Sequence, residues 1–312
     1  MTQPPNAIEL HALTKSFGPT IALDQVDLVV KPGLVFGFLG RNGAGKTTAL
    51  RILAGLARPT AGTACVLGHD VTRASEAVRE RIGFLPDVPA FYPWMTAREC
   101  LTFAGRLFGL DAATIHSRAD GLLEMAGLAS SDARVGGFSR GMKQRLGIAQ
   151  ALINAPSLLM LDEPTSALDP IGRKEVLEII ASLRGRTTVL FSSHILGDVE
   201  RVCDAVAILE RGRVVVSSGI AELTARATAK QLVVELEGDD GAALMRDLAG
   251  RAWLKTIDTR EGAIRMTVSD LAAAQREIPA AIAATGSALR RFEVDEATLE
   301  DVFVRLVDGA KS

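Results

Sequence analysis

Residues 40–47, with the sequence Gly-Arg-Asn-Gly-Ala-Gly-Lys-Thr, combine glycines, a lysine and a hydroxyl at a spacing that suits phosphate binding. The segment fits G-x-x-x-x-G-K-[ST], in which glycines let backbone N–H groups turn toward an anion. Lys46 would reach the β- and γ-phosphates, and the Thr47 hydroxyl would bind Mg²⁺. The pattern predicts a site for a nucleoside triphosphate. The alternative is an ordinary glycine turn followed by a surface lysine.

Two neighbouring acids are the second group that could do chemistry. Asp162 and Glu163 follow the apolar run 158–161. A carboxylate at the carboxyl end of a strand beside a phosphate loop can hold Mg²⁺, usually through water. A second carboxylate next to it can polarise the attacking water as a general base. Taken alone, the pair would be an acidic helix cap after a strand. Together with the phosphate loop, it predicts nucleotide hydrolysis.

The phosphate loop needs a strand before it and a helix after it, and the flanking residues predict both. Residues 34–39 form a continuous apolar run, which is typical of a strand buried on both faces. Leu50, Leu53 and Leu56 form an apolar stripe on a predicted helix over 46–56. The loop would then lie at a helix N-terminus, where partial positive charge favours an anion.

The rest of the first two thirds of the chain predicts an α/β cassette of the phosphate-loop NTPase type. Strands alternate with helices, which implies a mixed, largely parallel sheet with an antiparallel β subdomain. Helical patterns over about 88–155 predict an inserted helical subdomain, and Asp169-Pro170 has the residues of a helix start. We expect the cassette to occupy residues 1–224. The predicted strands lie at 8–16, 21–30, 34–39, 82–85, 157–161, 187–191, 205–209 and 214–216.

The pattern changes after about residue 225, where a second domain is expected over 225–312. Its strand-like and helical stretches follow the order βαββαβ, which predicts a small ferredoxin-like α+β unit. A last helix would carry Leu299, Val302, Phe303 and Leu306 on one packing stripe. Nothing in this region has catalytic spacing, so we expect a regulatory or dimer-stabilising accessory domain.

Length and composition restrict the possible classes of protein. A chain of 312 residues suits two domains, and a net charge of −2 gives no case for nucleic-acid binding. The three cysteines, Cys65, Cys100 and Cys203, lie far apart and suit a reducing cytoplasm, with small buried packing as their expected role. No apolar run of about 18 residues predicts a membrane span, and residues 1–6 do not resemble a signal peptide. Any membrane role would come through a partner.

The order of motifs resembles the ATP-binding cassette (ABC) ATPases over about residues 7–220. Phe17 stands where the family places an aromatic that stacks on adenine. Residues 138–145, Phe-Ser-Arg-Gly-Met-Lys-Gln-Arg, match the signature segment, and 166–169 match the loop that crosses the dimer interface. Residues 192–194, Ser-Ser-His, end in the switch histidine.

The resemblance implies a role for each matching residue. Glu163, His194 and Lys46 would be catalytic, and Mg²⁺ would contact Thr47, Asp162 and Asp87. Ser139 and Gly141 would contact the γ-phosphate bound by another copy, so that ATP joins two subunits. The residues expected to bind ATP are Phe17, Gly40, Asn42, Gly43, Ala44, Gly45, Lys46, Thr47, Thr48, Ser139 and Gly141.

The chain departs from the family pattern at two places. Asp87 stands where the family has a glutamine, so it would contact the metal shell through water. Arg140 and Met142 replace the second-position glycine of the signature and the residue that follows Gly141. These signature residues, with residues 297–303, resemble the drug- and antibiotic-resistance branch of exporter ATPases.

The resemblance implies an ATPase that powers a separate integral-membrane permease from the cytoplasmic face of the cell membrane. Its partners would be the permease and a second copy of the ATPase, or a paralogue, with no nucleic acid. The cargo would be drugs, antibiotics or lipid-like compounds. The aromatic segment 91–95 would be a docking surface for a helix of the permease, or else subdomain core. The alternatives are a soluble ATPase acting on ribosomes or nucleic acid, an importer ATPase, and a non-catalytic nucleotide-gated module.

Overall fold

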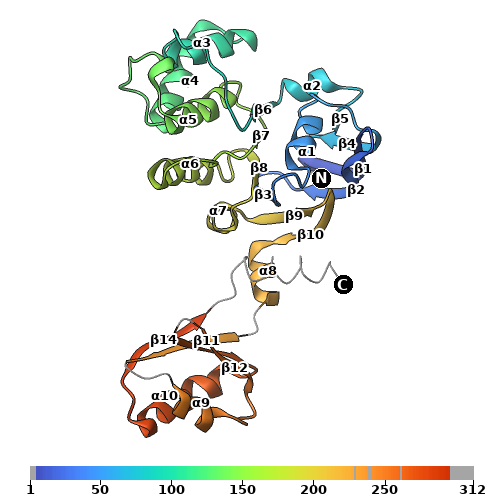
Figure 1. Ribbon diagram of the computed structural model, residues 1–312. Coiled ribbons are helices and arrows are strands. Elements are labelled where there is room, and N and C mark those ends of the chain that lie inside the picture. Colours follow the sequence, from blue (N-terminus) through green and yellow to red (C-terminus); the bar gives the residue numbers. More distant parts are fainter. Residues whose placement is uncertain (1–4, 228–229, 238–240, 261, 296–312) are drawn as a thin grey trace. The chain divides into compact units, whose positions relative to one another are not determined.

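The computed structural model describes residues 5–227, 230–237, 241–260 and 262–295. The chain divides into two compact units, Met1–Ile220 and Ala221–Ser312, whose elements are labelled in Figure 1. Across the described residues, no helix is both long enough and apolar enough to cross a membrane.

A six-stranded sheet forms the centre of the first unit. Its strands are β3 (Val35–Leu39), β6 (Ile82–Leu85), β7 (Leu158–Leu161), β8 (Thr188–Ser193), β9 (Ala205–Glu210) and β10 (Arg213–Gly219). They run in the order β10-β9-β3-β8-β7-β6, and every neighbouring pair is parallel except β9 with β10. All residues of β3, β7 and β8 are buried, as their apolar runs predict. The largely parallel sheet is therefore confirmed.

A four-stranded antiparallel sheet forms the predicted β subdomain. It contains β1 (Ile8–Phe17), β2 (Thr20–Val30), β4 (Ala61–Val66) and β5 (His69–Asp70), in the order β2-β1-β4-β5. β1 and β2 are antiparallel neighbours joined by a short turn at Gly18 and Pro19. The side chains of Leu10, Leu23 and Leu50 pack in the core that this sheet shares with the phosphate-loop strand.

In the described part of the first unit, seven α-helices connect these strands: α1 (Lys46–Leu53), α2 (Ser75–Arg79), α3 (Ala97–Leu107), α4 (Ala112–Met125), α5 (Arg140–Ala151), α6 (Pro170–Ser182) and α7 (Leu196–Val202). Helices α3, α4 and α5 lie together in the green part of the ribbon and have their own core around Leu101, Leu123 and Leu146 (Figure 1). The inserted helical subdomain is thus present. Helix α6 begins as predicted, since the Asp169 carboxylate accepts the backbone N–H of Gly172 at 3.0 Å.

Helix α1 ends earlier than the apolar pattern predicted. Leu50 and Leu53 are buried, but the helix stops at Leu53, and the side chain of Leu56 is 61% exposed. Gly55 has a φ of +69°, a left-handed conformation that terminates helices and that glycine adopts without steric cost. The third leucine of the stripe therefore leaves the core.

The second unit has the predicted βαββαβ order. After α8 (Ile220–Ala227) its elements are β11 (Lys230–Leu236), α9 (Ala242–Leu248), β12 (Leu254–Arg260), β13 (Ala263–Val268), α10 (Leu271–Thr285) and β14 (Leu289–Asp295). The sheet is antiparallel with the order β12-β13-β11-β14, as in a ferredoxin-like unit. Leu232, Trp253 and Ile278 belong to its core. The predicted last helix, with Leu299, Val302, Phe303 and Leu306, lies outside the described residues.

Candidate active site

The phosphate loop connects β3 to α1 through backbone conformations that need glycine. Gly45 has a φ of +108°, and a Cβ there would lie 2.4 Å from the carbonyl oxygen of Ala22. A Cβ on Gly40 would lie 2.4 Å from the carbonyl oxygen of Leu209. Both approaches are to backbone atoms, so a side chain could be accommodated only by moving a strand. The loop is therefore held between β2 and β9, with α1 beginning at Lys46.

The ammonium of Lys46 is buried inside the loop. Its Nζ donates to the carbonyl oxygens of Gly40 at 2.6 Å and Arg41 at 3.1 Å. The same Nζ lies 3.1 Å from Oε1 of Glu163, and the Lys46 side chain is only 5% exposed. The loop thus encloses one positive charge beside the Glu163 carboxylate.

Glu163 lies between two of the predicted catalytic residues. Its Oε1 pairs with Lys46, and its Oε2 lies 2.8 Å from Nδ1 of His194. Glu163 has a φ of +48°, which is uncommon for a residue with a side chain and is typical of functional turns. The turn directs this carboxylate into the space above the phosphate loop.

Asp162 lies deeper than Glu163 and has different partners. Its Oδ1 accepts hydrogen bonds from the hydroxyls of Ser192 at 2.7 Å and Thr47 at 3.2 Å. Burial raises the pKa of the Asp162 carboxyl, and these two hydrogen bonds oppose the rise. The side chain is 2% exposed. Asp162 therefore faces the first turn of α1 rather than open solvent.

A cavity of ≈ 350 Å³ lies above the loop. Most of the predicted site residues line it, together with two residues outside the predicted set, Ala22 and Ser166. The predicted residues that line it are Asn42, Gly43, Gly45, Lys46, Thr47, Thr48, Asp87, Glu163 and His194. The structure therefore assembles one site from residues that lie far apart in the sequence.

Other predicted residues do not line this cavity. Gly40 and Ala44 hold the loop from within, while Phe17 is 56% exposed with Lys15 Nζ 4.8 Å from its ring centroid. Ser139 caps α5, accepting the backbone N–H of Met142 at 3.2 Å, and Gly141 lies in the first turn of the same helix. Within one chain, the signature segment is therefore separate from the phosphate loop.

Asp87 connects these two regions. It lines the cavity, and its Oδ1 lies 3.9 Å from the guanidinium of Arg140, with both side chains about half exposed. The two departures from the family pattern are thus neighbours in space. An exposed pair at this distance stabilises the fold very little.

The oxygen donors near Thr47 fit the coordination chemistry of Mg²⁺. The described residues contain no group of three or more His, Cys, Asp or Glu side chains that could hold a metal. Mg²⁺ usually takes one or two protein oxygens and completes its shell with water and substrate phosphates. The hydroxyl of Thr47 and the carboxylate of Asp162, 3.2 Å apart, are a donor set of this kind.

Family models and relatives agree with the arrangement. A sequence model described as "ABC transporter" matches residues 23–166, and one described as the C-terminal domain of DrrA1-3-like ATP-binding proteins matches 219–307. The bacitracin transport ATP-binding protein BcrA of Bacillus licheniformis is 37% identical over 97% of this chain and 97% of that protein. The daunorubicin/doxorubicin resistance ATP-binding protein DrrA of Streptomyces peucetius is 36% identical over 98% of this chain and 93% of that protein.

Solved structures resemble the cassette. The ATP-binding subunit of an ABC transporter is 30% identical, with a TM-score of 0.64, over 70% of this chain and 92% of that chain. A dimeric ATP-binding cassette bound to ADP and phosphate is 26% identical, with a TM-score of 0.61, over 68% of this chain and 98% of that chain. The fold, the phosphate loop and the near full-length relatives lead to one conclusion: this chain belongs to the ABC transporter family and is an ATPase with a DrrA-like C-terminal domain.

Proposed function

We propose that this chain is the ATP-hydrolysing subunit of an exporter for drugs, antibiotics or lipid-like compounds. The observation that carries the proposal is the placement of Glu163 between Lys46 and His194 above the phosphate loop. Export is supported by the near full-length similarity to proteins named for bacitracin transport and daunorubicin resistance.

In the proposed reaction, the glycine loop and Lys46 bind the β- and γ-phosphates of ATP. The phosphate oxygens take the place of the loop carbonyls as acceptors for the Lys46 ammonium. Thr47 and Asp162 would hold Mg²⁺, with Asp87 contacting its water shell, and the ion would neutralise charge on these phosphates.

Glu163 is the proposed general base. A water molecule attacks the γ-phosphorus, the bond from that phosphorus to the bridging oxygen breaks, and ADP leaves. Glu163 accepts the proton that the water loses. His194, 2.8 Å from Oε2 of Glu163, orients this carboxylate and contacts the γ-phosphate. This contact between His194 and Glu163 keeps the base in one position during the reaction.

Two chains form the complete site in this proposal. Ser139 and Gly141 begin α5, a 12-residue helix whose N-terminus attracts anions. Since they do not line the cavity of their own chain, we propose that they contact the γ-phosphate of ATP held by a second copy or a paralogue. ATP would then close the dimer, and hydrolysis would reopen it.

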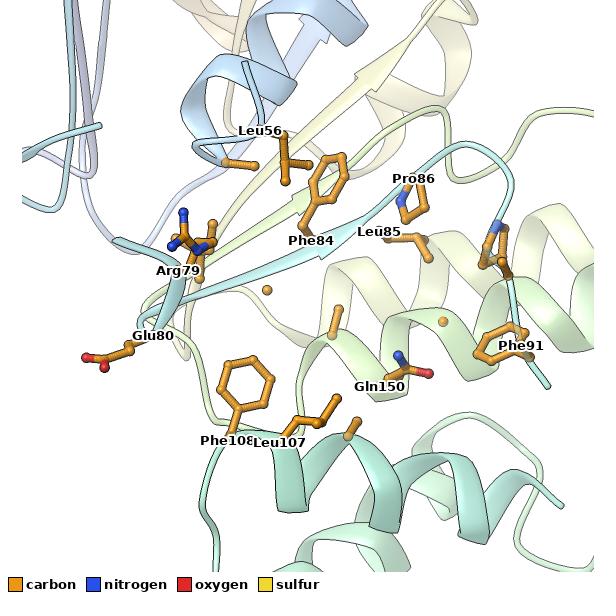
Figure 2. A pocket seen from close by; sticks show the side chains of 18 of the residues that line it. Leu56, Arg79, Glu80, Phe84, Leu85, Pro86, Phe91, Leu107, Phe108 and Gln150 are labelled. Atoms are coloured by element: carbon orange, nitrogen blue, oxygen red, sulfur yellow. The ribbon is translucent and has the colours of Figure 1, made fainter. Parts of the chain in front are cut away.

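A groove in the first unit is the proposed docking site for the permease. It is a cavity of ≈ 880 Å³ between β6 and helices α3 and α5. Figure 2 shows Phe84 on one side of this space and Leu107 and Phe108 on the other. The exposed fraction is 72% for Leu107 and 43% for Phe108, so apolar surface is available to a partner. We propose that a cytoplasmic helix of the permease fills the groove and holds the ATPase at the membrane.

Phe91 lines the same groove, and the exposed rings beside it extend the apolar surface. Tyr92 and Trp94 are 48% and 59% exposed, with ring centroids 5.1 Å apart. Phe91 and Met95 also pack against the subdomain core. The aromatic segment thus divides between the two predicted roles, and its exposed part supports docking.

The substitution Glu163→Gln tests the proposed function. The amide cannot accept the proton, so we expect ATP binding to remain, hydrolysis to fall by about 100-fold or more, and a stable dimer to form with ATP. Binding is measured with a fluorescent ATP analogue, hydrolysis by phosphate release, and dimers by size-exclusion chromatography. Glu178→Gln, which changes an exposed residue paired with Lys174, is the matched control and should behave as wild type. Full hydrolysis by Glu163→Gln would exclude Glu163 as the base.

A further inference from the structure

Ser192 is a fully buried residue between the phosphate-loop strand and the strand that carries the acids. It lies on β8, which pairs with β3 on one side and β7 on the other, and its relative exposure is 0%. Its hydroxyl donates to Oδ1 of Asp162 at 2.7 Å and accepts the backbone N–H of Glu163 at 2.9 Å. Because a backbone N–H can only donate, the single hydroxyl proton is available for Asp162.

The bond to Glu163 holds the start of a strained turn. Glu163 has a φ of +48°, and a residue with a side chain keeps this conformation only where surrounding contacts impose it. Ser192 binds the N–H of Glu163, and the carbonyl oxygen of Glu163 accepts the N–H of Ser166 at 3.0 Å. This turn brings the Glu163 carboxylate to Lys46 and His194.

The bond to Asp162 orients the other acid. Ser192 and Thr47 donate to the same oxygen, Oδ1, from opposite partners in the fold, one on β8 and one on α1. A carboxylate held in this way keeps its remaining lone pairs in a defined direction. The hydroxyl of Ser192 therefore contacts both acids without lining the cavity itself.

Other buried hydroxyls of β8 do not have this arrangement. Thr188 lies on the same face of the strand, and its hydroxyl accepts the N–H of Gly33 at 3.0 Å. The hydroxyl of Ser193 accepts the N–H of Ile195 at 2.9 Å. Both of these hydroxyls bond to backbone groups, whereas the Ser192 hydroxyl also bonds to a carboxylate of the site.

We propose that Ser192 is a positioning residue for ATP hydrolysis, which sets the orientation of Asp162 and the turn at Glu163 through one hydroxyl. The proposal rests on the proposed function of these two acids. Ser192 does not contact the reacting atoms, so it acts only through them. Removing its hydroxyl should impair hydrolysis and the response to Mg²⁺, while the phosphate loop should still bind the nucleotide.

Three variants of the full chain test this proposal: Ser192→Ala, Ser192→Thr and Thr188→Val. A fluorescent ATP analogue reports binding in EDTA and in Mg²⁺, and phosphate release reports hydrolysis over a Mg²⁺ titration. For Ser192→Ala we expect unchanged binding in EDTA, a higher half-saturating Mg²⁺ concentration and a kcat about 10- to 100-fold lower. Ser192→Thr retains the hydroxyl and should restore most of the activity.

Thr188→Val separates positioning from a loss of strand stability. Like Ser192→Ala, it leaves a backbone N–H without its acceptor, so both variants should have a lower unfolding temperature. Only Ser192→Ala should lose hydrolysis and Mg²⁺ response. Equal losses in both variants would overturn the proposal, as would wild-type hydrolysis by Ser192→Ala while Glu163→Gln is inactive. If Glu163→Gln itself hydrolyses ATP fully, the proposed function fails and the role of Ser192 fails with it.

Discussion

At the scale of single residues, two adjacent acids have different environments. Asp162 is 2% exposed and accepts two hydroxyl donors, whereas Glu163 pairs with Lys46 and His194. The positive φ of Glu163 is the cause, since it turns the chain between the two side chains. Neighbours in sequence therefore take separate proposed roles, one toward Mg²⁺ and one toward water.

The raised pKa of Asp162 predicts a pH dependence of stability. Burial, the largest cause, makes the folded-state pKa higher than the unfolded value of 3.8, so the folded state binds the proton more tightly. Stability contributed by this group is therefore present below pH 3.8 and lost as pH rises through the folded pKa. We expect Asp162→Asn to unfold at a higher temperature than wild type at pH 7, while Mg²⁺-dependent hydrolysis is lost.

Thermal unfolding from pH 4 to pH 8, without nucleotide or Mg²⁺, measures this effect. The advantage of Asp162→Asn should shrink toward low pH, where wild-type Asp162 becomes protonated. A variant less stable than wild type at pH 7, or an advantage that grows toward low pH, would contradict the assignment.

At the scale of elements, strand β6 and helix α5 pack closely through a glycine on each. A Cβ on Gly83 would lie 2.1 Å from the carbonyl oxygen of Ala151, and one on Gly147 would lie 2.4 Å from Cδ1 of Leu85. The first neighbour is backbone and the second is the end of a side chain. This contact holds the helix of the signature segment against the sheet edge that leads to Asp87.

Gly83→Ala should destabilise the chain by about 1–3 kcal/mol, because the added methyl must displace the backbone of α5. Gly147→Ala should cost less, since the Leu85 side chain can rotate. Gly121→Ala, on the exposed face of α4 with open space around it, should instead stabilise by about 0.5–1 kcal/mol. Urea unfolding of the three variants measures the order, and a neutral Gly83→Ala would refute the packing argument.

At the scale of the whole molecule, one chain presents two halves of a proposed site in different places. The phosphate loop lines the cavity, and Ser139 and Gly141 do not. Because a complete site in this proposal needs two chains, hydrolysis by the isolated chain should rise more steeply than linearly with protein concentration.

We propose the same domain limits that the sequence suggests, a cassette over 1–224 and an accessory domain over 225–312.

Mixing two inactive variants tests the composite site. Lys46→Ala disables the phosphate loop, and Ser139→Ala removes a signature contact. A mixed dimer would retain one intact site, formed by the loop of the Ser139→Ala chain and the signature of the Lys46→Ala chain. Random pairing at equal concentrations makes about half of the dimers mixed, and each mixed dimer has one of its two sites intact, so we expect the mixture to recover about a quarter of the wild-type activity, measured by phosphate release. No recovery, with dimers present, would indicate that each chain hydrolyses ATP with its own residues.

The sequence alone determined the phosphate loop, the family and most of the strands and helices, but it did not predict β4 and β5. Glycine spacing reports local backbone demands, and apolar runs report burial, so both can be recognised without tertiary contacts. Leu50 and Leu53 are buried on α1 as the apolar pattern predicts, whereas Leu56 is exposed because the helix ends before it, ahead of Gly55. The apolar pattern therefore predicted the helix but not the residue at which it ends.

Only the tertiary structure decided which side chains meet. Thr47 and Asp162 are 115 residues apart, and their hydrogen bond depends on β3, β8 and β7 being parallel neighbours in register. A shift of one residue would turn Ser192 away from Asp162, since alternate side chains of a strand point to opposite faces. In the sequence, Ser192 was only the first residue of the motif that ends in His194, with no role of its own. Its contact with both acids follows from strand pairing, which no local pattern in the sequence encodes.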